Sequence, residues 1–170
     1  MTVADRLEVE VVKAVRAAVP AAFIKEVLTR AVTLPEIAAR LPEGGSTVAV
    51  RLASDRELRR LNRVYAGEDH ATDVLSFAGA GDHLGDIAVS WPAVVRQSTQ
   101  YGHPETTELA LLSVHGLLHL LGWDHATREE RREMSRLNVA ALKPSGLKPA
   151  MRWVRSGYTP LQGLRHSPRA

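Results

Sequence analysis

Cysteine is missing from this chain, which excludes disulfides, iron–sulfur clusters, thiolate zinc sites and cysteine nucleophiles. Long hydrophobic runs are missing too: the longest, Leu109–Trp123, falls short of the ~20 residues that a membrane helix needs. The amino terminus lacks the apolar core of a signal peptide. We therefore expect a cytoplasmic protein with no membrane partner.

Acidic residues are missing from the end of the chain. Residues 143–170 contain six Lys or Arg and no Asp or Glu, whereas residues 1–142 contain 16 basic residues and all 19 acidic ones. The net charge of +3 therefore belongs to the tail, which excludes a uniformly basic nucleic-acid coat protein. We expect one domain over residues 1–142 and a basic, Pro- and Gly-containing tail over 143–170, a candidate for phosphate contacts.

Hydropathy patterns predict an α+β fold. Alternating or short apolar runs predict strands, and helical spacing with capping residues predicts helices between them. The expected result is a small mixed four-stranded sheet packed with helices, with a long apolar helix at its centre. The strands are expected over 6–12, 46–53, 73–77 and 86–89, and the helices over 21–41 with a break at Pro35, then 55–65, 92–100, 104–122 and 127–142.

Histidines gather at the end of the apolar helix. His115 and His119 are four residues apart, so a helix presents both imidazoles on one face. Gly122 can end that helix in the left-handed conformation and turn the chain back, which brings in His125 as a third ligand. Three imidazoles with an open fourth position are typical of a catalytic zinc ion, whereas four protein ligands are typical of a structural one. We therefore predict one zinc ion per chain on this helix.

The spacing resembles the metzincin protease pattern H-E-x-x-H-x-x-G-x-x-H. The chain departs from it at Gly116, where the protease has the glutamate that takes a proton from water. A peptidase mechanism is therefore disfavoured.

The histidine segment resembles more closely the signature H-G-x-L-H-L-x-G-x-D-H of the YbeY family of single-strand-specific metallo-endoribonucleases. Two further blocks are similar to that family: Leu61-Asn62-x-x-Tyr65 through Thr72–Phe77, and Leu84–Ile87. The resemblance implies that His115, His119 and His125 bind zinc. It also implies cleavage of single-stranded RNA in maturation of the small-subunit (16S) rRNA 3′ end and in ribosome quality control, with rRNA and the small ribosomal subunit as partners and no DNA.

The chain departs from the family pattern where cations are expected. The Arg after the motif Tyr is Ala66 here, and the Lys that follows is Glu68. Developing charge on a phosphoryl group is normally stabilised by Arg or Lys. Our hypothesis is that Arg63 takes this catalytic role; a solvated helix charge is the alternative.

Asp124, beside His125, is the other catalytic candidate. It can orient a ligand imidazole or accept a proton, and the alternative is a carboxylate that shapes the turn. Ser76 could hydrogen-bond substrate, but a serine on an alternating strand is more often a surface residue, which is what we expect here. His103 lacks metal-ligand spacing, and we expect it at the surface.

Two other functions remain open at this point. One is a metal-dependent hydrolase of a different substrate, such as a peptide. The other is a non-catalytic ribosome-assembly factor whose zinc ion is structural. A fourth protein ligand would favour the structural ion, and three histidines alone would favour an enzyme.

Overall fold

The structure is a computed structural model that describes residues 1–156 and 164–166. Its sheet has five strands in the order β1-β2-β4-β3-β5. β1, β2 and β4 are mutually parallel, β3 runs antiparallel to β4, and β5 pairs parallel with the outer edge of β3. The strands are β1 (Leu7–Lys13), β2 (Ser46–Ala53), β3 (Val74–Ala78), β4 (His83–Ser90) and β5 (Leu164–His166).

The predicted α+β class and all four predicted strands are confirmed. The short strand β5 is an addition from the tail. The predicted helices are present in the predicted order: α1 (Ala21–Ala31), α2 (Pro35–Ala38), α3 (Asp55–Ala66), α4 (Trp91–Tyr101), α5 (Glu105–Leu120) and α6 (Arg128–Leu142). Helix α7 (Met151–Ser156) and the 3-10 turns η1 (Ala4–Arg6) and η2 (Lys143–Ser145) were not predicted.

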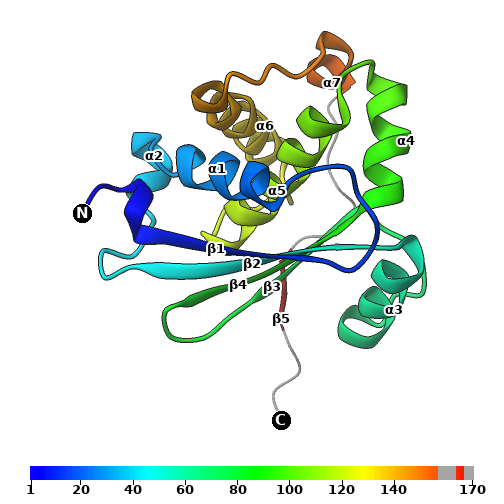
Figure 1. Ribbon diagram of the computed structural model, residues 1–170, viewed down its shortest axis with the longest axis horizontal. Coiled ribbons are helices and arrows are strands. Elements are labelled where there is room, and N and C mark those ends of the chain that lie inside the picture. Colours follow the sequence, from blue (N-terminus) through cyan, green and yellow to red (C-terminus); the bar gives the residue numbers. More distant parts are fainter. Residues whose placement is uncertain (157–163, 167–170) are drawn as a thin grey trace.

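Helices cover the two faces of the sheet unequally (Figure 1). α1, α2, α5 and α6 lie on one face, and α3 lies on the other. The larger core fills the first layer, where buried side chains of β2 such as Val48 and Val50 belong to the same cluster as Leu117 of α5. A smaller core lies under α3, where Leu58 packs with Leu75 and Phe77 of β3. Successive β3 side chains therefore face different helices, as the pleat of a strand requires.

Side chains cap the starts of α3 and α6. Ser54 Oγ accepts the backbone N–H of Glu57 at 3.1 Å, and Thr127 forms a complete capping box with Glu130. The Glu57 side chain does not bond back to the Ser54 backbone to complete a capping box, because its carboxylate pairs with Arg51 at 2.7 Å. The caps satisfy N–H groups that the helix itself leaves without partners.

Regular structure continues beyond residue 142. The segment after α6 forms η2 and α7, and Trp153 is buried in the main hydrophobic cluster. The backbone N–H of Ala150 donates to His103 Nδ1 at 3.0 Å, and Arg152 donates to the carbonyl of Gln100 at 2.8 Å. Residues 143–156 therefore pack on the body, while 157–163 and 167–170 lie outside the described residues. In the described part of the chain, no helix is long and apolar enough to cross a membrane.

Candidate metal centre

Helix α5 holds the first two histidines of the cluster. His115 and His119 are both buried, and their ring centroids lie 4.6 Å apart. The helix presses close to the sheet between them, because a Cβ added at Gly116 would lie 2.7 Å from Ile87 Cγ2 and 3.0 Å from Ser76 Oγ. A small residue at this position therefore lets the helix approach the sheet. The glutamate that the protease motif has at this position would therefore be too close to the sheet, so packing as well as chemistry distinguishes this chain from the protease.

A helix-ending turn supplies the third histidine. Gly122 has φ +99°, and its N–H donates to the carbonyl of His119 at 3.0 Å. The next N–H, of Trp123, donates to the carbonyl of Leu118 at 3.0 Å, which completes a Schellman motif. His125 then lies with its ring centroid 5.5 Å from that of His115 and 4.8 Å from that of His119. The predicted left-handed turn and the predicted clustering are both confirmed.

The three imidazoles are suited to hold a metal ion. One possible ligand atom from each lies within 4.8 Å of the others. The Nε2 atoms of all three are buried and have no hydrogen-bond partner. A buried polar atom without a partner is costly, and a metal ion bound by the three lone pairs would remove that cost. The donor set therefore fits a metal ion.

Burial also favours the neutral form that binds metals. It lowers the pKa of His115 well below its usual range, and the neighbouring histidines lower it further. Burial, with a smaller contribution from His125, lowers the pKa of His119 to about 4. The charge of Asp124, and to a smaller extent a hydrogen bond to the backbone of Trp123, act in the opposite direction on this pKa. Both imidazoles are therefore neutral at pH 7, and their lone pairs are available to a cation.

In the described part of the chain, three histidines make up the cluster. Among residues 1–156, whose side chains are described, no other His, Asp or Glu joins it. A site with three ligands keeps a position for water or substrate, whereas a structural zinc site uses four. The geometry therefore favours a catalytic centre.

Asp124 shapes the turn that carries His125. Its Oδ1 accepts the backbone N–H of His125 at 2.8 Å, and the residue is exposed. It lines a pocket of about 360 Å³ beside Trp123 and Arg40, whose guanidinium lies 3.7 Å from the centroid of the Trp123 ring. Asp124 therefore shapes this turn, as the alternative interpretation expected, and its catalytic role stays a prediction.

Arg63 lies in the last turn of α3 and is exposed. It lines a pocket of about 600 Å³ formed by α3 and its cap, and the lining contains none of the three histidines. The catalytic role of Arg63 stays a prediction too.

Two residues expected at the surface are buried. Ser76 is 3% exposed, and its Oγ donates to the carbonyl of Gly116 at 3.3 Å, between the two helical ligands. His103 is 8% exposed; it accepts the N–H of Ala150 at Nδ1, so its Nε2–H donates to Glu108 Oε1 at 2.8 Å. Both expectations were wrong because each residue is covered by a segment distant in sequence: Gly116 lies 40 positions from Ser76, and Ala150 lies 47 positions from His103. For Ser76, the one sequence signal of burial was its place in an alternating strand of a sheet that helices cover on both faces.

Known proteins resemble this chain over most of its length. A family model described as Endoribonuclease YbeY matches residues 10–146. A protein named Endoribonuclease YbeY from Chloroflexus aurantiacus is 42% identical over 135 residues, which covers 69% of this chain and 87% of that protein. One of the same name from Bacillus cereus is 37% identical over 139 residues, or 74% of this chain and 86% of that protein.

A solved structure supports the fold independently. The solution structure of a Thermotoga maritima protein covers 82% of this chain and 92% of its own, with a TM-score of 0.56 and 21% identity. The resemblance inferred from the histidine motif is confirmed by the family model and the relatives. This chain belongs to the Endoribonuclease YbeY family.

Proposed function

We propose that this protein is a zinc-dependent endoribonuclease that hydrolyses phosphodiester bonds of single-stranded RNA. The observation that carries the proposal is the set of three buried, partnerless Nε2 atoms with no fourth protein ligand among the described residues. Membership of a family named for endoribonuclease activity supports RNA as the substrate.

The histidines have one clear role in this proposal. His115, His119 and His125 would hold the ion, and α5 fixes the first two because it is packed against the sheet at Gly116. When bound, zinc supplies Lewis-acid activation of water and of a phosphoryl oxygen. Imidazole ligands also suit nickel, copper and iron, so zinc is part of the proposal.

Two further residues complete the proposed chemistry. Asp124 holds the backbone of His125 and offers an exposed carboxylate that can accept a proton. Arg63 is the candidate to replace the cations that the family pattern has at Ala66 and Glu68. If Arg63→Ala leaves the rate of RNA cleavage unchanged, Arg63 has no such role.

The cellular role follows from the family resemblance. We propose that the protein acts in the cytoplasm on the 3′ end of small-subunit rRNA and in ribosome quality control, with the small ribosomal subunit as its partner. The proposal requires that the chain recognise exposed single strands of rRNA.

Two alternatives have less support from the site. A peptidase would need a proton acceptor at position 116, and the close approach of Ile87 and Ser76 leaves no room for a glutamate there. A structural zinc ion would need a fourth ligand, which the described residues do not supply.

The test is cleavage of single-stranded RNA by the purified protein, with double-stranded RNA and an unstructured peptide as parallel substrates. We expect cleavage of the single strand alone, and loss of that cleavage in a chelator. Cleavage of the peptide, or RNA cleavage that survives complete removal of metal, would refute the proposal.

A further inference from the structure

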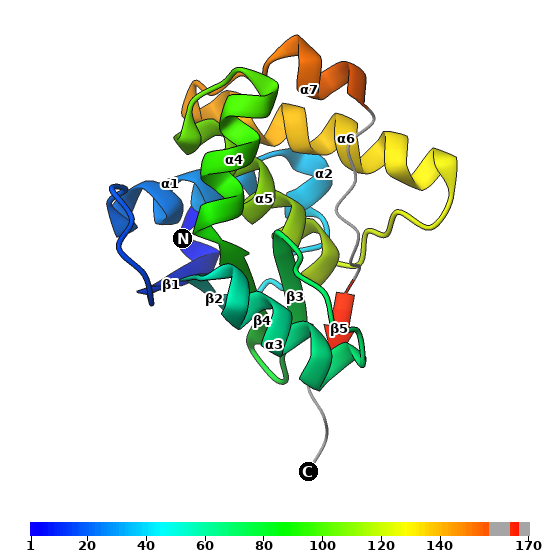
Figure 2. The same ribbon diagram turned by 90° about the vertical axis from the view of Figure 1, so that its right-hand side faces the viewer.

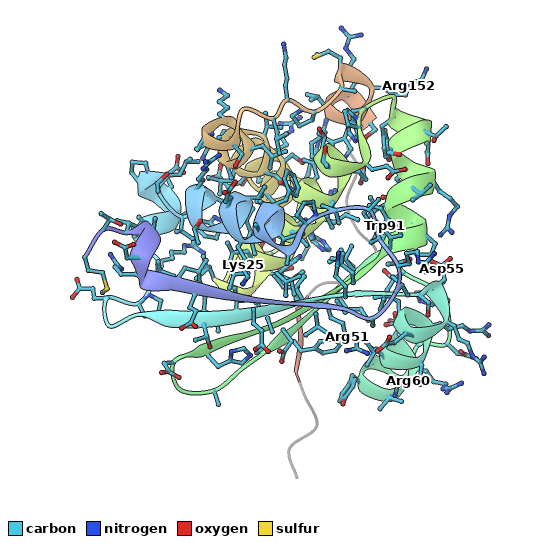
Figure 3. All side chains as sticks on the ribbon, viewed as in Figure 1. Lys25, Arg51, Asp55, Arg60, Trp91 and Arg152 are labelled. Carbon is cyan, nitrogen blue, oxygen red and sulfur yellow. The ribbon has the colours of Figure 1, made fainter. Side chains whose placement is uncertain are left out.

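Four arginines form a stripe on the outer face of α3. Arg56, Arg59, Arg60 and Arg63 follow the spacing i, i+3, i+4 and i+7, which places them on one side of the helix. All four line the same pocket of about 600 Å³. Figure 3 shows Arg60 on α3, on the far side of the sheet from Lys25 of α1. We call these four residues the arginine stripe.

The acidic residues of α3 do not neutralise the stripe. Asp55 pairs with Arg96 of α4 at 2.8 Å, and Glu57 pairs with Arg51 of β2 at 2.7 Å. Both carboxylates of the helix are thus bound by arginines from other elements. The stripe keeps its own positive charge as a result.

Only one member of the stripe has an ion pair within the described residues. Arg59 binds the Asp69 carboxylate through two nitrogens, at 2.8 and 3.3 Å. In the same part of the chain, Arg56, Arg60 and Arg63 form no ion pair. Arg56 and Arg60 therefore have no carboxylate partner among the described residues, and Arg63 has only the nearby charge of Asp69, which is itself paired with Arg59.

We propose that the arginine stripe binds the phosphates of single-stranded RNA, an inference that rests on the proposed function. Guanidinium groups remain charged at every physiological pH and bind phosphate through two parallel hydrogen bonds. From Arg56 to Arg63 the helix rises about 10 Å. A stacked strand places about three phosphates over that length, at about 3.4 Å each. A polyanion with regularly spaced phosphates thus matches the row in charge and in length.

The position of α3 connects the stripe to the metal centre. α3 and α5 contact the same two strands, β3 and β5, from opposite faces of the sheet. Figure 2 shows α3 beside β3 and β5, with α5 above these strands. To reach the histidines, an RNA strand bound on the stripe would have to pass round this edge of the sheet. The family pattern has Arg and Lys at positions where this chain has Ala66 and Glu68. The arginine stripe offers other cations for RNA phosphates in their place.

The test measures RNA binding separately from cleavage. The probe is a fluorescent single-stranded 2′-O-methyl oligonucleotide, and its affinity for the metal-loaded full chain is followed by anisotropy across a salt series. The test variant is Arg56→Ala/Arg60→Ala, which leaves Arg63 in place. The matched control, Lys25→Ala/Arg30→Ala, removes two exposed cations from α1. Arg56→Lys/Arg60→Lys keeps the charge and controls for changes in folding.

Each phosphate contact contributes about 0.7 to the slope of log affinity against log salt for a single strand. The Ala double variant should therefore lower the slope by about 1.4, and the affinity at 0.1 M salt by about 25-fold. The α1 control should match the wild type, and the Lys variant should keep most of the slope. An unchanged slope in the Ala variant would overturn the proposal, as would an equal loss in the control.

Two further results distinguish this proposal from binding of another anionic partner and from the proposed function itself. If the Ala variant binds anionic vesicles or polyglutamate less well but RNA as before, the stripe serves another partner and the proposal is wrong. If the slope is unchanged while wild-type RNA cleavage persists, the stripe proposal fails and the proposed function stands.

Discussion

Single residues decide how closely α5 approaches the sheet. Ile87 and Ser76 of the sheet lie next to the position that a Cβ of residue 116 would occupy. The Ser76 hydroxyl also donates a hydrogen bond to the Gly116 carbonyl. The two helical ligands flank this contact. The histidine cluster therefore depends on a residue that has no chemistry of its own.

We predict that Gly116→Ala destabilises the protein. The added methyl group would overlap Ile87, and overpacking costs about 1–3 kcal/mol, against a gain in helix propensity of up to about 1 kcal/mol. The control is Gly44→Ala, because a Cβ there meets nothing within 4 Å. Urea denaturation of both variants tests this, and equal stabilities for the two would contradict the packing argument.

Glu108 is a buried carboxyl that none of the proposed chemistry uses. Burial, together with the charge of Asp73, raises the pKa of Glu108 to about 8. Between its ordinary value and about pH 8 the folded protein holds a proton that the unfolded chain releases. Stability therefore falls as the pH rises through this window.

We predict that Glu108→Gln reduces the loss of stability between about pH 5 and pH 8. The amide oxygen still accepts the Nε2–H of His103, but the group no longer titrates. The matched control is Glu105→Gln, exposed on the same helix, which should leave the pH dependence unchanged. Denaturation midpoints across this range decide the question, and a slope as steep as that of the wild type would refute the assignment.

At the scale of elements, local patterns predicted most of the fold. The four longer strands and the helices up to α6 follow from alternation, helical spacing and the caps at Ser54 and Thr127, whereas α7 was not predicted. The histidine cluster could be predicted because a helical repeat and the turn at Gly122 are both local features. Strand β5 could not, because its three residues carry no period and its partner β3 is remote.

Long-range partners account for the residues that were misjudged. Ser76 binds a carbonyl 40 positions away, and His103 binds Ala150 across 47 positions. Nothing in the local sequence reports such pairs. For the same reason, the sequence alone does not predict the net positive charge of α3, which depends on ion pairs of its two carboxylates with Arg51 and Arg96.

At the scale of the whole molecule, part of the basic tail is built into the body. Residues 143–156 carry four of the six tail cations, and Trp153 in this segment is 4% exposed. Deleting residues 143–170 would therefore remove core packing as well as charge. Charge substitution, rather than deletion, is the way to measure any contact between the tail and RNA.

We predict that a chain ending at residue 142 is less stable than one ending at residue 156. Loss of a buried Trp costs about 3–5 kcal/mol, which corresponds to a fall in Tm of about 10 °C for a chain of this size. Removing only residues 157–170 leaves Trp153 in place. Thermal unfolding of the two chains makes the comparison, and equal melting temperatures would show that the docked segment contributes nothing to stability.

The most direct test of the account is a zinc titration of the metal-free protein during cleavage of single-stranded RNA. The three-histidine site predicts that the rate rises with added zinc and levels off at one ion per chain, and that His119→Ala removes this response. His70→Ala, at an exposed histidine outside the cluster, should behave as the wild type. Cleavage that is already maximal without metal, or that responds equally to zinc in His119→Ala, would contradict the account.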